Sequence, residues 1–204
     1  MTYDALKNTL SRYPVEMAII TLDYCNNVIG VSPCAAIDWC GKPGLYCGLS
    51  TAFCGGIQGQ CYNTYATCKD KTNYSKGSKD YVFTSNNAPL PFRTGERPYI
   101  TTVKHLPTEI KTSLTIAGRV NVEMYDEPDT DIGIDPYVSM RASVQGSFWR
   151  KLIARNPNYA GRRIRLYHGF YGLAAVDFAQ KFEGNIDSIT IKEGGIITIE
   201  CVDL

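Results

Sequence analysis

The cysteines are the residues of this chain most suited to chemistry, because seven of the eight lie in one stretch from Cys25 to Cys68. Thiols packed this densely are typical of a segment that ligates a metal ion or an iron–sulfur cluster, or that is cross-linked by disulfides. A need for small apolar side chains does not explain them, since other residues meet that need without redox chemistry. The sequence therefore predicts a segment whose order comes from bonds to sulfur.

The gaps between the cysteines bear on which of these chemistries applies. Zinc modules usually use pairs of cysteines two to four residues apart, whereas the shortest gap here, from Cys34 to Cys40, has five residues between them, which disfavours a zinc ribbon. Wider gaps suit an iron–sulfur cluster, whose corners lie farther apart than the ligands of one ion. Disulfides would leave one of the seven cysteines unpaired unless Cys201 joins them. All three chemistries stay open on spacing alone.

Composition limits the class of protein. The chain has 204 residues, of which 44% are hydrophobic and 20% charged, and its net charge is +1. These values are typical of a folded soluble protein and give no global field that recruits nucleic acid or an anionic membrane. The N-terminus lacks the pattern of a signal peptide, and no apolar run approaches the roughly 20 residues that span a bilayer. We expect folding in a reducing cytosol, where stable disulfides are uncommon, and this favours metal ligation.

The segment that holds the cysteines differs from the residues before it. Residues 4–13 have the spacing of a short amphipathic helix that ends at Pro14, and residues 17–24 are apolar and β-branched, as in a buried strand. Residues 25–79 are rich in glycine, proline, asparagine and serine and have neither a helix nor a strand period. Such a stretch cannot bury enough apolar surface to hold its shape unaided. We expect a cysteine-rich loop insert over residues 25–79.

The residues after this insert read mainly as strands. In the alternating pattern of residues 111–126, Val120, Val122 and Met124 share one face. Cys201 alternates in the same way and is predicted to be a core residue rather than a ligand. The chain ends inside that last pattern, so we expect either a closing edge strand or a polypeptide that continues past Leu204. Strands are expected at 80–86, 98–106, 111–126 and 162–170, followed by a hairpin over 181–204.

One clear helix interrupts these strands. Residues 146–159 have helical spacing, with Ser147 at the N-cap and Asn156-Pro157 at the end. Together the patterns predict a mainly β fold with one or two short helices. Its β-rich domain comprises residues 1–24 and 80–204, and the cysteine-rich segment interrupts it.

The remaining titratable residues give weaker signals. His105 and His168 lie in or beside strands, where a partly exposed histidine is more common than a metal ligand. The acidic loop over residues 127–136 lacks the spacing of a calcium-binding EF-hand, so a solvated or interface loop is expected. The basic residues from Arg150 to Arg165 favour docking to a charged subunit over nucleic-acid binding. No nucleophile-elbow, dinucleotide, P-loop or zincin motif occurs, and we expect no enzymatic activity.

Two blocks of sequence resemble the signature of siphophage tail-tip hub proteins. The first is LDYCNNVIGVSPCAA (22–36), and the second is CYNTYATCKDKTNYSKGSKDYVF (61–83). Farther on, GRVNVEMYDEPDTDIGIDPY and GSFWRKLIARNP are similar to the segment that follows in that family. The family includes hubs of gene transfer agents. It is related in architecture to the lambda minor tail protein L, whose relatives hold an iron–sulfur cluster with four cysteines.

The resemblance implies which cysteines are ligands. Cys25 and Cys34 match the first block and Cys61 and Cys68 the second, which makes these four the ligands of an iron–sulfur cluster of the 4Fe–4S type, with zinc as the alternative. Asn63 and Thr64, just after Cys61, are expected to hydrogen-bond the sulfurs or the turn. The stretch between the blocks has no counterpart in the family pattern. Its cysteines are substitutes for a ligand, or form a disulfide once the particle leaves the cell: Cys40, Cys47 and Cys54.

The resemblance also implies a fold and a function. It implies a β-barrel-like or sandwich-like hub domain in a structural component of the tail tip of a long-tailed phage. Three copies would form a ring under the distal tail protein, in contact with the central fibre or tip proteins and the C-terminus of the tape measure. The location would be the virion, after assembly in the host cytoplasm, with no membrane and no specific nucleic acid as partner. The alternatives are an iron–sulfur electron-transfer or redox-sensing protein and a zinc-stabilised binding module.

Overall fold

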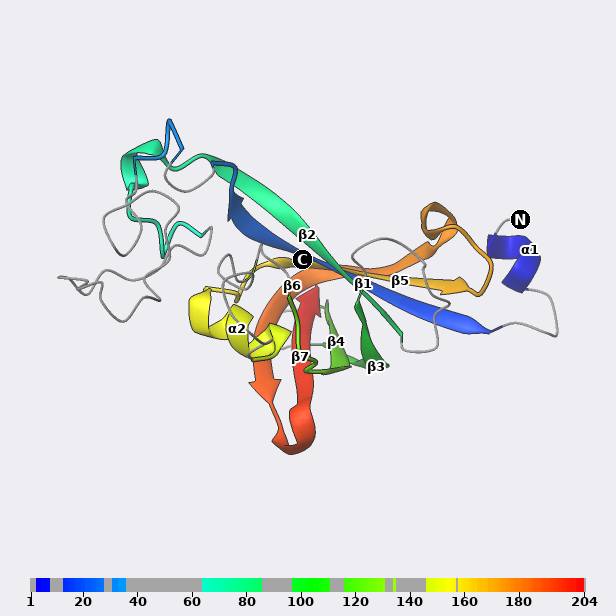
Figure 1. The fold of residues 1–204 in the computed structure, drawn as a ribbon. Coiled ribbons are helices and arrows are strands. Elements are labelled where there is room, and N and C mark those ends of the chain that lie inside the picture. Colours follow the sequence, from blue (N-terminus) through cyan, green and yellow to red (C-terminus); the bar gives the residue numbers. More distant parts are fainter. Residues whose placement is uncertain are drawn as a thin grey trace. The chain divides into compact units, whose positions relative to one another are not determined.

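In the part of the chain that the structure describes, seven strands form a closed barrel in the order β1-β2-β3-β4-β7-β6-β5 (Figure 1). The computed structural model describes residues 3–7, 13–27, 31–35, 64–85, 97–110, 116–130, 134, 146–156 and 158–203. The prediction of a mainly β fold with few short helices is confirmed. The strands are β1 (Pro14–Cys25), β2 (Lys76–Ser85), β3 (Arg97–Ile110), β4 (Ile116–Tyr125), β5 (Arg163–Phe170), β6 (Ala179–Ile191) and β7 (Ile196–Asp203).

The helices of the described residues are short. They are the α-helices α1 (Tyr3–Lys7) and α2 (Phe148–Arg155) and the 3-10 turns η1 (Lys71–Asn73), η3 (Ala175–Asp177) and η4 (Glu193–Gly195). None of these helices is long and apolar enough to cross a membrane.

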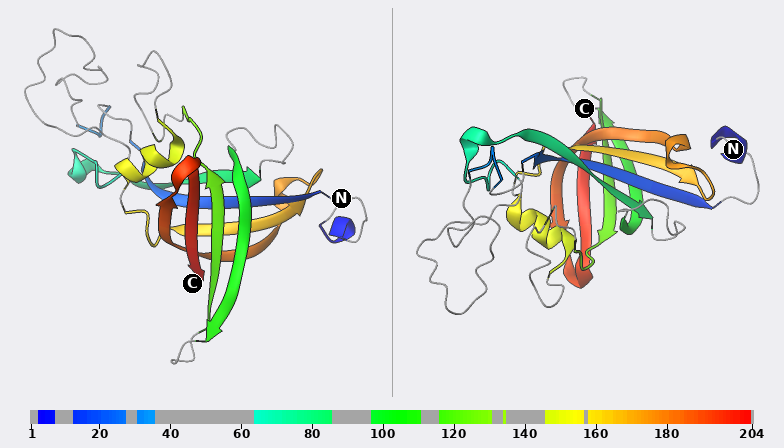
Figure 2. Two further views of the ribbon diagram at one scale, coloured as in Figure 1. Left: turned by 90° about the horizontal axis from the view of Figure 1, so that it is seen from below. Right: turned by 45° about the horizontal axis from the view of Figure 1, so that its top comes forward.

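Most neighbouring strands of the barrel are antiparallel, and the pair β1–β5 closes it. The β1–β5 register runs from Pro14↔Phe170 to Ile20↔Ile164. The predicted hairpin near the C-terminus is confirmed as β6 and β7, which are joined by η4. The exception is the parallel pair β2–β3, which is short and irregular: only Phe83↔Arg97 and Ser85↔Ile100 are in register. The two further views in Figure 2 show the strands wrapping around the interior.

The interior is built from the alternation that the sequence predicts. Val120, Val122 and Met124 of β4 are all buried, and β7 places Ile197, Ile199 and Cys201 opposite them. Each fully buried aliphatic side chain contributes about 1.5–3 kcal/mol relative to an exposed one, so these cross-strand pairs hold the β4–β7 wall. Cys201 is a core residue as predicted, and burial raises the pKa of its thiol to about 12.

A polar contact joins three strands on the outside of the barrel. The Arg165 guanidinium on β5 donates to Asp80 Oδ2 on β2 at 2.9 Å. The hydroxyl of Thr21 on β1 donates to the other oxygen of Asp80 at 2.6 Å. An exposed pair of this kind is worth only about 0.2–1 kcal/mol. The contact ties β2 to β1 and β5, and this matters because β2 pairs with β3 over only a short stretch.

The chain divides into two compact units. One comprises Met1–Leu22, Asp80–Asp126 and Tyr159–Leu204, and the other comprises Asp23–Lys79 and Glu127–Asn158. The segment expected as an insert, 25–79, lies within the second unit. The second unit also includes α2, which the sequence pattern had placed with the β-rich domain.

Two of the predicted elements differ in extent. Among the described residues of the first segment, Tyr3–Lys7 is helical, and residues 8–12 of the predicted helix lie outside the described residues. β1 begins earlier than predicted, at Pro14, because proline is tolerated as the first residue of a strand. Helix α2 is shorter than predicted. Ser147 occupies its N-cap position, but the side chain makes no capping hydrogen bond. Instead the carbonyl of Glu127 accepts from the Phe148 N–H at 3.0 Å, because a β-bridge holds Pro128 against Ser147.

The close packing of β6 against β7 gives a test of the barrel. A methyl group on Gly184 would overlap the carbonyl oxygen of Val202 and the ring of Phe182. We expect Gly184→Ala to lower the free energy of unfolding by about 1–3 kcal/mol, because the strand backbone must shift to admit the added carbon. Urea denaturation followed by far-UV circular dichroism measures this.

A second strand glycine serves as the matched control. A methyl group on Gly118 would lie 3.6 Å from Asp203 Oδ2, which is an ordinary contact. We expect Gly118→Ala to change the free energy of unfolding by less than about 0.5 kcal/mol. Equal midpoints for the two variants would contradict the β6–β7 packing described above.

Candidate metal centre

Cys25 is the last residue of β1 and is buried, with 9% of its surface exposed. The residues that follow it are fastened to the chain just before β2. The Asn26 N–H donates to the Ser75 carbonyl at 3.0 Å, and the Asn26 side-chain amide donates to the Lys76 carbonyl at 3.4 Å. The Asn27 amide donates to the Asn73 carbonyl at 2.6 Å. These bonds hold the Cys25 end of the segment against its Asn73–Lys76 end.

Cys34 closes a turn that contains a cis peptide bond between Ser32 and Pro33. Its N–H donates to the Val31 carbonyl at 2.8 Å. The next N–H, that of Ala35, donates to Asp70 Oδ2 at 2.7 Å. The Cys34 turn is therefore tied to the residues that follow Cys68.

Cys68 closes a second turn, which begins at Thr64. The Cys68 N–H donates to the Tyr65 carbonyl at 3.2 Å. The hydroxyls of Thr64 and Thr67 lie 2.9 Å apart, and the Thr67 N–H donates to the Thr64 hydroxyl at 3.4 Å. Thr64, which was expected to bond either the sulfurs or the turn, bonds the turn. Asn63, like Cys40, Cys47, Cys54 and Cys61, lies outside the described residues.

Asp70 connects the two turns. Besides the Ala35 N–H, its carboxylate accepts from the Asn73 side-chain amide at 2.9 Å and from the Asn73 N–H at 3.4 Å, as the N-cap of η1. The amide of Asn73 and the N–H of Ala35 hold the pKa of this carboxyl below its ordinary value. Sequence reasoning did not single out Asp70. Its signal is an aspartate three residues before an asparagine, the spacing of an N-cap.

The three described sulfurs of the expected ligand set share one electrostatic environment. Burial raises the pKa of the Cys68 thiol, and the charges of Cys25, Cys34 and Asp70 raise it further. The Asp70 N–H donates to the Cys68 sulfur and opposes this rise. Cys25 and Cys34 therefore lie near enough to Cys68 for their charges to act on its thiol, although the three residues lie far apart in the sequence.

This environment fits ligation better than nucleophilic chemistry. A reactive cysteine needs a lowered pKa, whereas the pKa of Cys68 is raised. A bound cation would remove the mutual repulsion that raises it, and the sulfurs would then ligate as thiolates. A backbone N–H aimed at a sulfur is the outer contact that such a site uses to stabilise its thiolates.

The separation of the sulfurs distinguishes one ion from a cluster. Thiolates at ~2.3 Å from one zinc ion lie only about 3.8 Å from each other. Among the described residues, no three cysteine, histidine or acidic side chains converge to hold a single ion. The ligands of a cluster sit on separate corners and lie farther apart. The iron–sulfur cluster, with zinc as the alternative, stays a prediction from the sequence.

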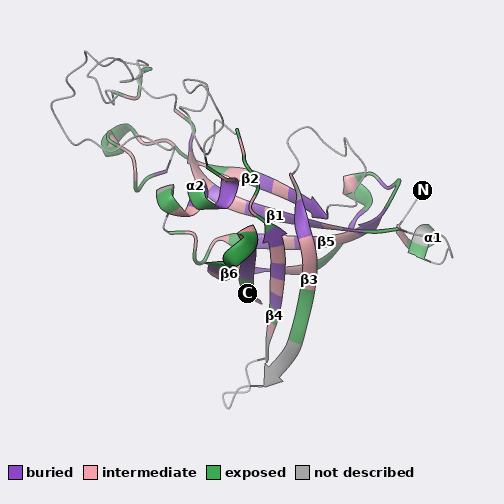
Figure 3. Ribbon diagram, turned by 60° about the horizontal axis from the view of Figure 1, so that its bottom comes forward, coloured by how far each residue is buried: buried purple, intermediate pink, exposed green. Residues whose placement is uncertain are grey.

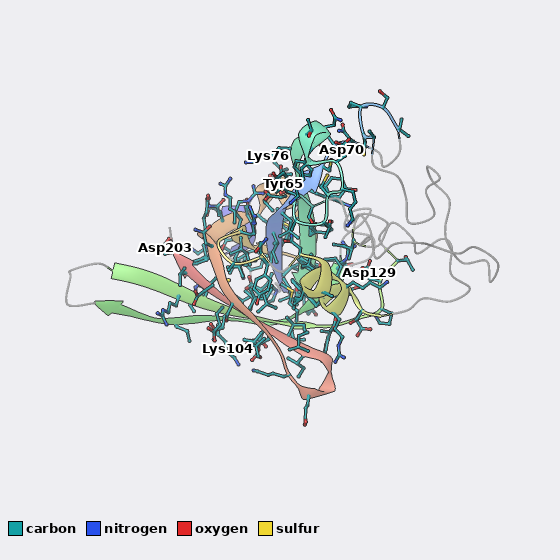
Figure 4. The ribbon with its side chains drawn as sticks, turned by 90° about the vertical axis from the view of Figure 1, so that its left-hand side faces the viewer. Tyr65, Asp70, Lys76, Lys104, Asp129 and Asp203 are labelled. Carbon is teal, nitrogen blue, oxygen red and sulfur yellow. The ribbon has the colours of Figure 1, made fainter. Side chains whose placement is uncertain are left out.

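Aromatic and cationic side chains of the second unit contact one another, and Figure 4 labels Tyr65, Asp70 and Lys76 of this unit. Tyr65 meets Tyr74 edge to face, with 5.2 Å between the ring centroids. The Lys71 ammonium lies 5.2 Å above the Tyr65 ring, and Lys79 lies 5.5 Å from the ring of Tyr24. Cations at this distance from an aromatic ring form cation–π contacts.

The other candidate groups lie elsewhere and have partners. His105 is exposed on β3. The Nδ1 atom of His168 on β5 lies 3.2 Å from the Tyr3 hydroxyl, and its Nε2 lies 3.9 Å from Glu16. Within the basic run, Arg163 pairs with Glu183 and Arg165 pairs with Asp80.

The comparisons with known proteins identify no family for this chain. Neither the comparison with protein-family models nor the search of curated proteins finds a match to this chain. The membership of the tail-tip hub family stays a prediction from the two cysteine blocks and the segments after them.

The bridging carboxylate of Asp70 gives a test of this geometry. Since its pKa in the folded chain is lowered, the stabilisation is complete above the ordinary value of 3.8 and is lost as the pH falls through the folded-state pKa. The backbone amide shift of Ala35, followed by NMR, is expected to titrate with a midpoint below 3.8.

Two variants complete this test. In Asp70→Ala the titration of the Ala35 amide is expected to vanish, because its acceptor is gone. In Lys69→Ala, which changes the exposed neighbour, the titration should persist. An Ala35 amide that titrates unchanged in Asp70→Ala would show that the two turns are not joined by this carboxylate.

Proposed function

We propose that this chain is a structural component of the tail tip of a long-tailed phage, in which an iron–sulfur cluster holds the cysteine-rich segment together. The observation that carries the proposal is that the charges of Cys25 and Cys34 act on the Cys68 thiol, and these are three of the four cysteines that the resemblance implies as ligands. They belong to both cysteine blocks, which are separated by a long stretch of sequence.

The cysteine segment has little else to hold it. Among its described residues 31–35 and 64–79, Thr64 alone is buried, and the others are exposed or half-buried. Hydrogen bonds through Asn26, Asn27 and Asp70 join its parts, but bonds of this kind each contribute only about 0.5–1.5 kcal/mol. A ligated cluster supplies the order that an apolar core would otherwise give.

The role of the cluster in this proposal is structural rather than catalytic. The raised pKa of Cys68 keeps it from acting as a reactive thiol, and no catalytic motif occurs in the sequence. The closed barrel is a rigid body from which neighbours in a ring of three copies, the distal tail protein and the tip proteins can be contacted. An electron-transfer protein is the second candidate, because Cys34 and Cys68 are only half-buried and a cluster there would lie near the surface.

Anaerobic purification with iron and sulfide tests the cluster. We expect about four irons per chain and a brown protein, since four thiolates hold a 4Fe–4S cluster. Serine at Cys25, Cys34, Cys61 or Cys68 should each lower the iron content severalfold. The matched control is Cys201→Ala, which removes a buried thiol of the barrel and should retain the iron.

The outcome separates the alternatives. Zinc without sulfide would support the zinc-stabilised module, and metal-free protein with disulfides would refute ligation altogether. A cluster that is bleached by dithionite and restored by air at a potential matched to a partner enzyme would favour electron transfer. Iron retained in all four serine variants would contradict the ligand set.

Assembly is tested by the mass of the complex in solution. The chain has a mass of 22.6 kDa, so three copies amount to about 68 kDa (3 × 22.6). Light scattering after size-exclusion chromatography of the cluster-loaded protein is expected to give this trimer mass. A mass of one chain at concentrations of tens of micromolar would speak against a self-assembling ring.

A further inference from the structure

β3 leaves one edge without a neighbouring strand over most of its length. Its parallel pairing with β2 ends at Ser85↔Ile100, whereas its antiparallel pairing with β4 continues to Ile110↔Ile116. In the residues that the structure describes, nothing pairs with the β2 side of β3 beyond Ile100. Figure 2 (left) shows β3 as the outer strand of the long β3–β4 hairpin.

The usable part of this edge is six residues long. It begins after Ile100 and runs from Thr101 to Leu106, because Pro107 has no N–H and the β3–β4 register shifts between Leu106 and Glu109. At roughly 3.3 Å per residue, this edge is about 20 Å long. A row of unmatched N–H and C=O groups of this length is a template for another extended strand.

The second half of this edge is exposed, whereas Thr101, Thr102 and Val103 are half-buried. Lys104, His105 and Leu106 are exposed, and Figure 3 shows this stretch of β3 as exposed. His105 lies opposite Val120 of β4, which is buried in the barrel. Because cross-strand partners share a face, His105 occupies an inward-facing position that nothing in the described chain covers.

We propose that the edge from Thr101 to Leu106 binds an extended segment of another protein. The segment has about six residues, contains no proline and carries an acidic side chain opposite Lys104. Its backbone completes the ladder of β3, which is the β-augmentation mode of recognition. The proposal concerns the barrel alone and holds whatever cofactor the cysteine segment binds.

The charge at the edge selects a different chain over a second copy. Two β3 edges paired antiparallel over Thr101–Leu106 would place Val103 of one copy opposite Lys104 of the other, so a second copy brings no carboxylate to this position. Opposite charges directly across a strand pair stabilise it. The chain's own linker over residues 86–96 is poorly suited as well, since Pro89 and Pro91 lack the N–H groups that a ladder requires.

Lys104 can exchange its partner without leaving a carboxylate unpaired. Its ammonium lies 3.3 Å from Glu123 Oε2 on β4, and 55% of its side chain is exposed. The ammonium of Lys192 lies 3.6 Å from the other oxygen of Glu123. Lys104 can therefore turn to an incoming carboxylate while Lys192 keeps Glu123 neutralised.

The test uses the full chain and a capped six-residue peptide that alternates valine and glutamate. We expect the peptide to bind and to slow hydrogen exchange of the backbone amides in Thr101–Leu106 severalfold. The same peptide N-methylated throughout should bind at least about tenfold more weakly, since it cannot donate to the ladder.

Lys104→Glu should weaken binding about tenfold and transfer the preference to a peptide of valine and lysine. Lys181→Glu, which changes an exposed lysine of β6 outside this edge, should stay within about twofold.

Four results would overturn the proposal. The first is no protection of these amides at millimolar peptide, and the second is equal binding of the N-methylated peptide. The third is full protection of the amides in the free monomer, which would mean that the chain covers its own edge. The fourth is protection that rises with protein concentration in the absence of peptide, which would assign the edge to a second copy.

Discussion

The pairing of β1 with β2 constrains both ends of the cysteine segment. β1 ends at Cys25 and β2 begins at Lys76, and the bond from the Asn26 N–H to the Ser75 carbonyl extends their pairing beyond the strands. A long loop whose ends are already held together by a folded barrel loses less entropy when its interior is cross-linked. The paired strands therefore lower the entropy that is lost when the cysteine segment is cross-linked. The carboxylate of Asp70 adds the link between the two inner turns.

The pKa of Cys68 bears on which chemistry the cysteine segment can perform. Burial and neighbouring charges raise the pKa of Cys68, so the free thiol is a poor nucleophile at neutral pH. The same repulsion between thiolates is relieved by a cation that all of them ligate. Cys201 shows the contrast. It is equally cysteine, but it lies in the apolar wall of β4 and β7, and no other described cysteine acts on its thiol. We infer that position in the fold, rather than residue type, separates the core thiol from the thiols proposed as ligands.

The sequence predicts the strands because one face of the sheet is buried and the other is exposed. Apolar residues such as Val120 and Val122 therefore alternate with polar ones along each strand. It predicts the β6–β7 hairpin because the turn is local. It does not predict the β1–β5 closure or the parallel β2–β3 contact, which join residues far apart and leave no periodic pattern. In the candidate site, Cys25, Cys34 and Cys68 are found from local motifs. Asp70 was missed because its partner Ala35 is distant in sequence.

The central claim is that sulfur ligation to a cluster orders the cysteine segment. Native mass spectrometry of the anaerobically purified full chain tests it most directly, because each chemistry changes the mass in its own way. The account predicts that each chain carries the added mass of one four-iron, four-sulfide cluster. Chelation should remove this mass, and the backbone amides around Cys34 and Cys68 should then lose their protection from hydrogen exchange. A chain at the mass of its sequence, or lighter by two hydrogens for each disulfide, with these amides equally protected, would contradict it.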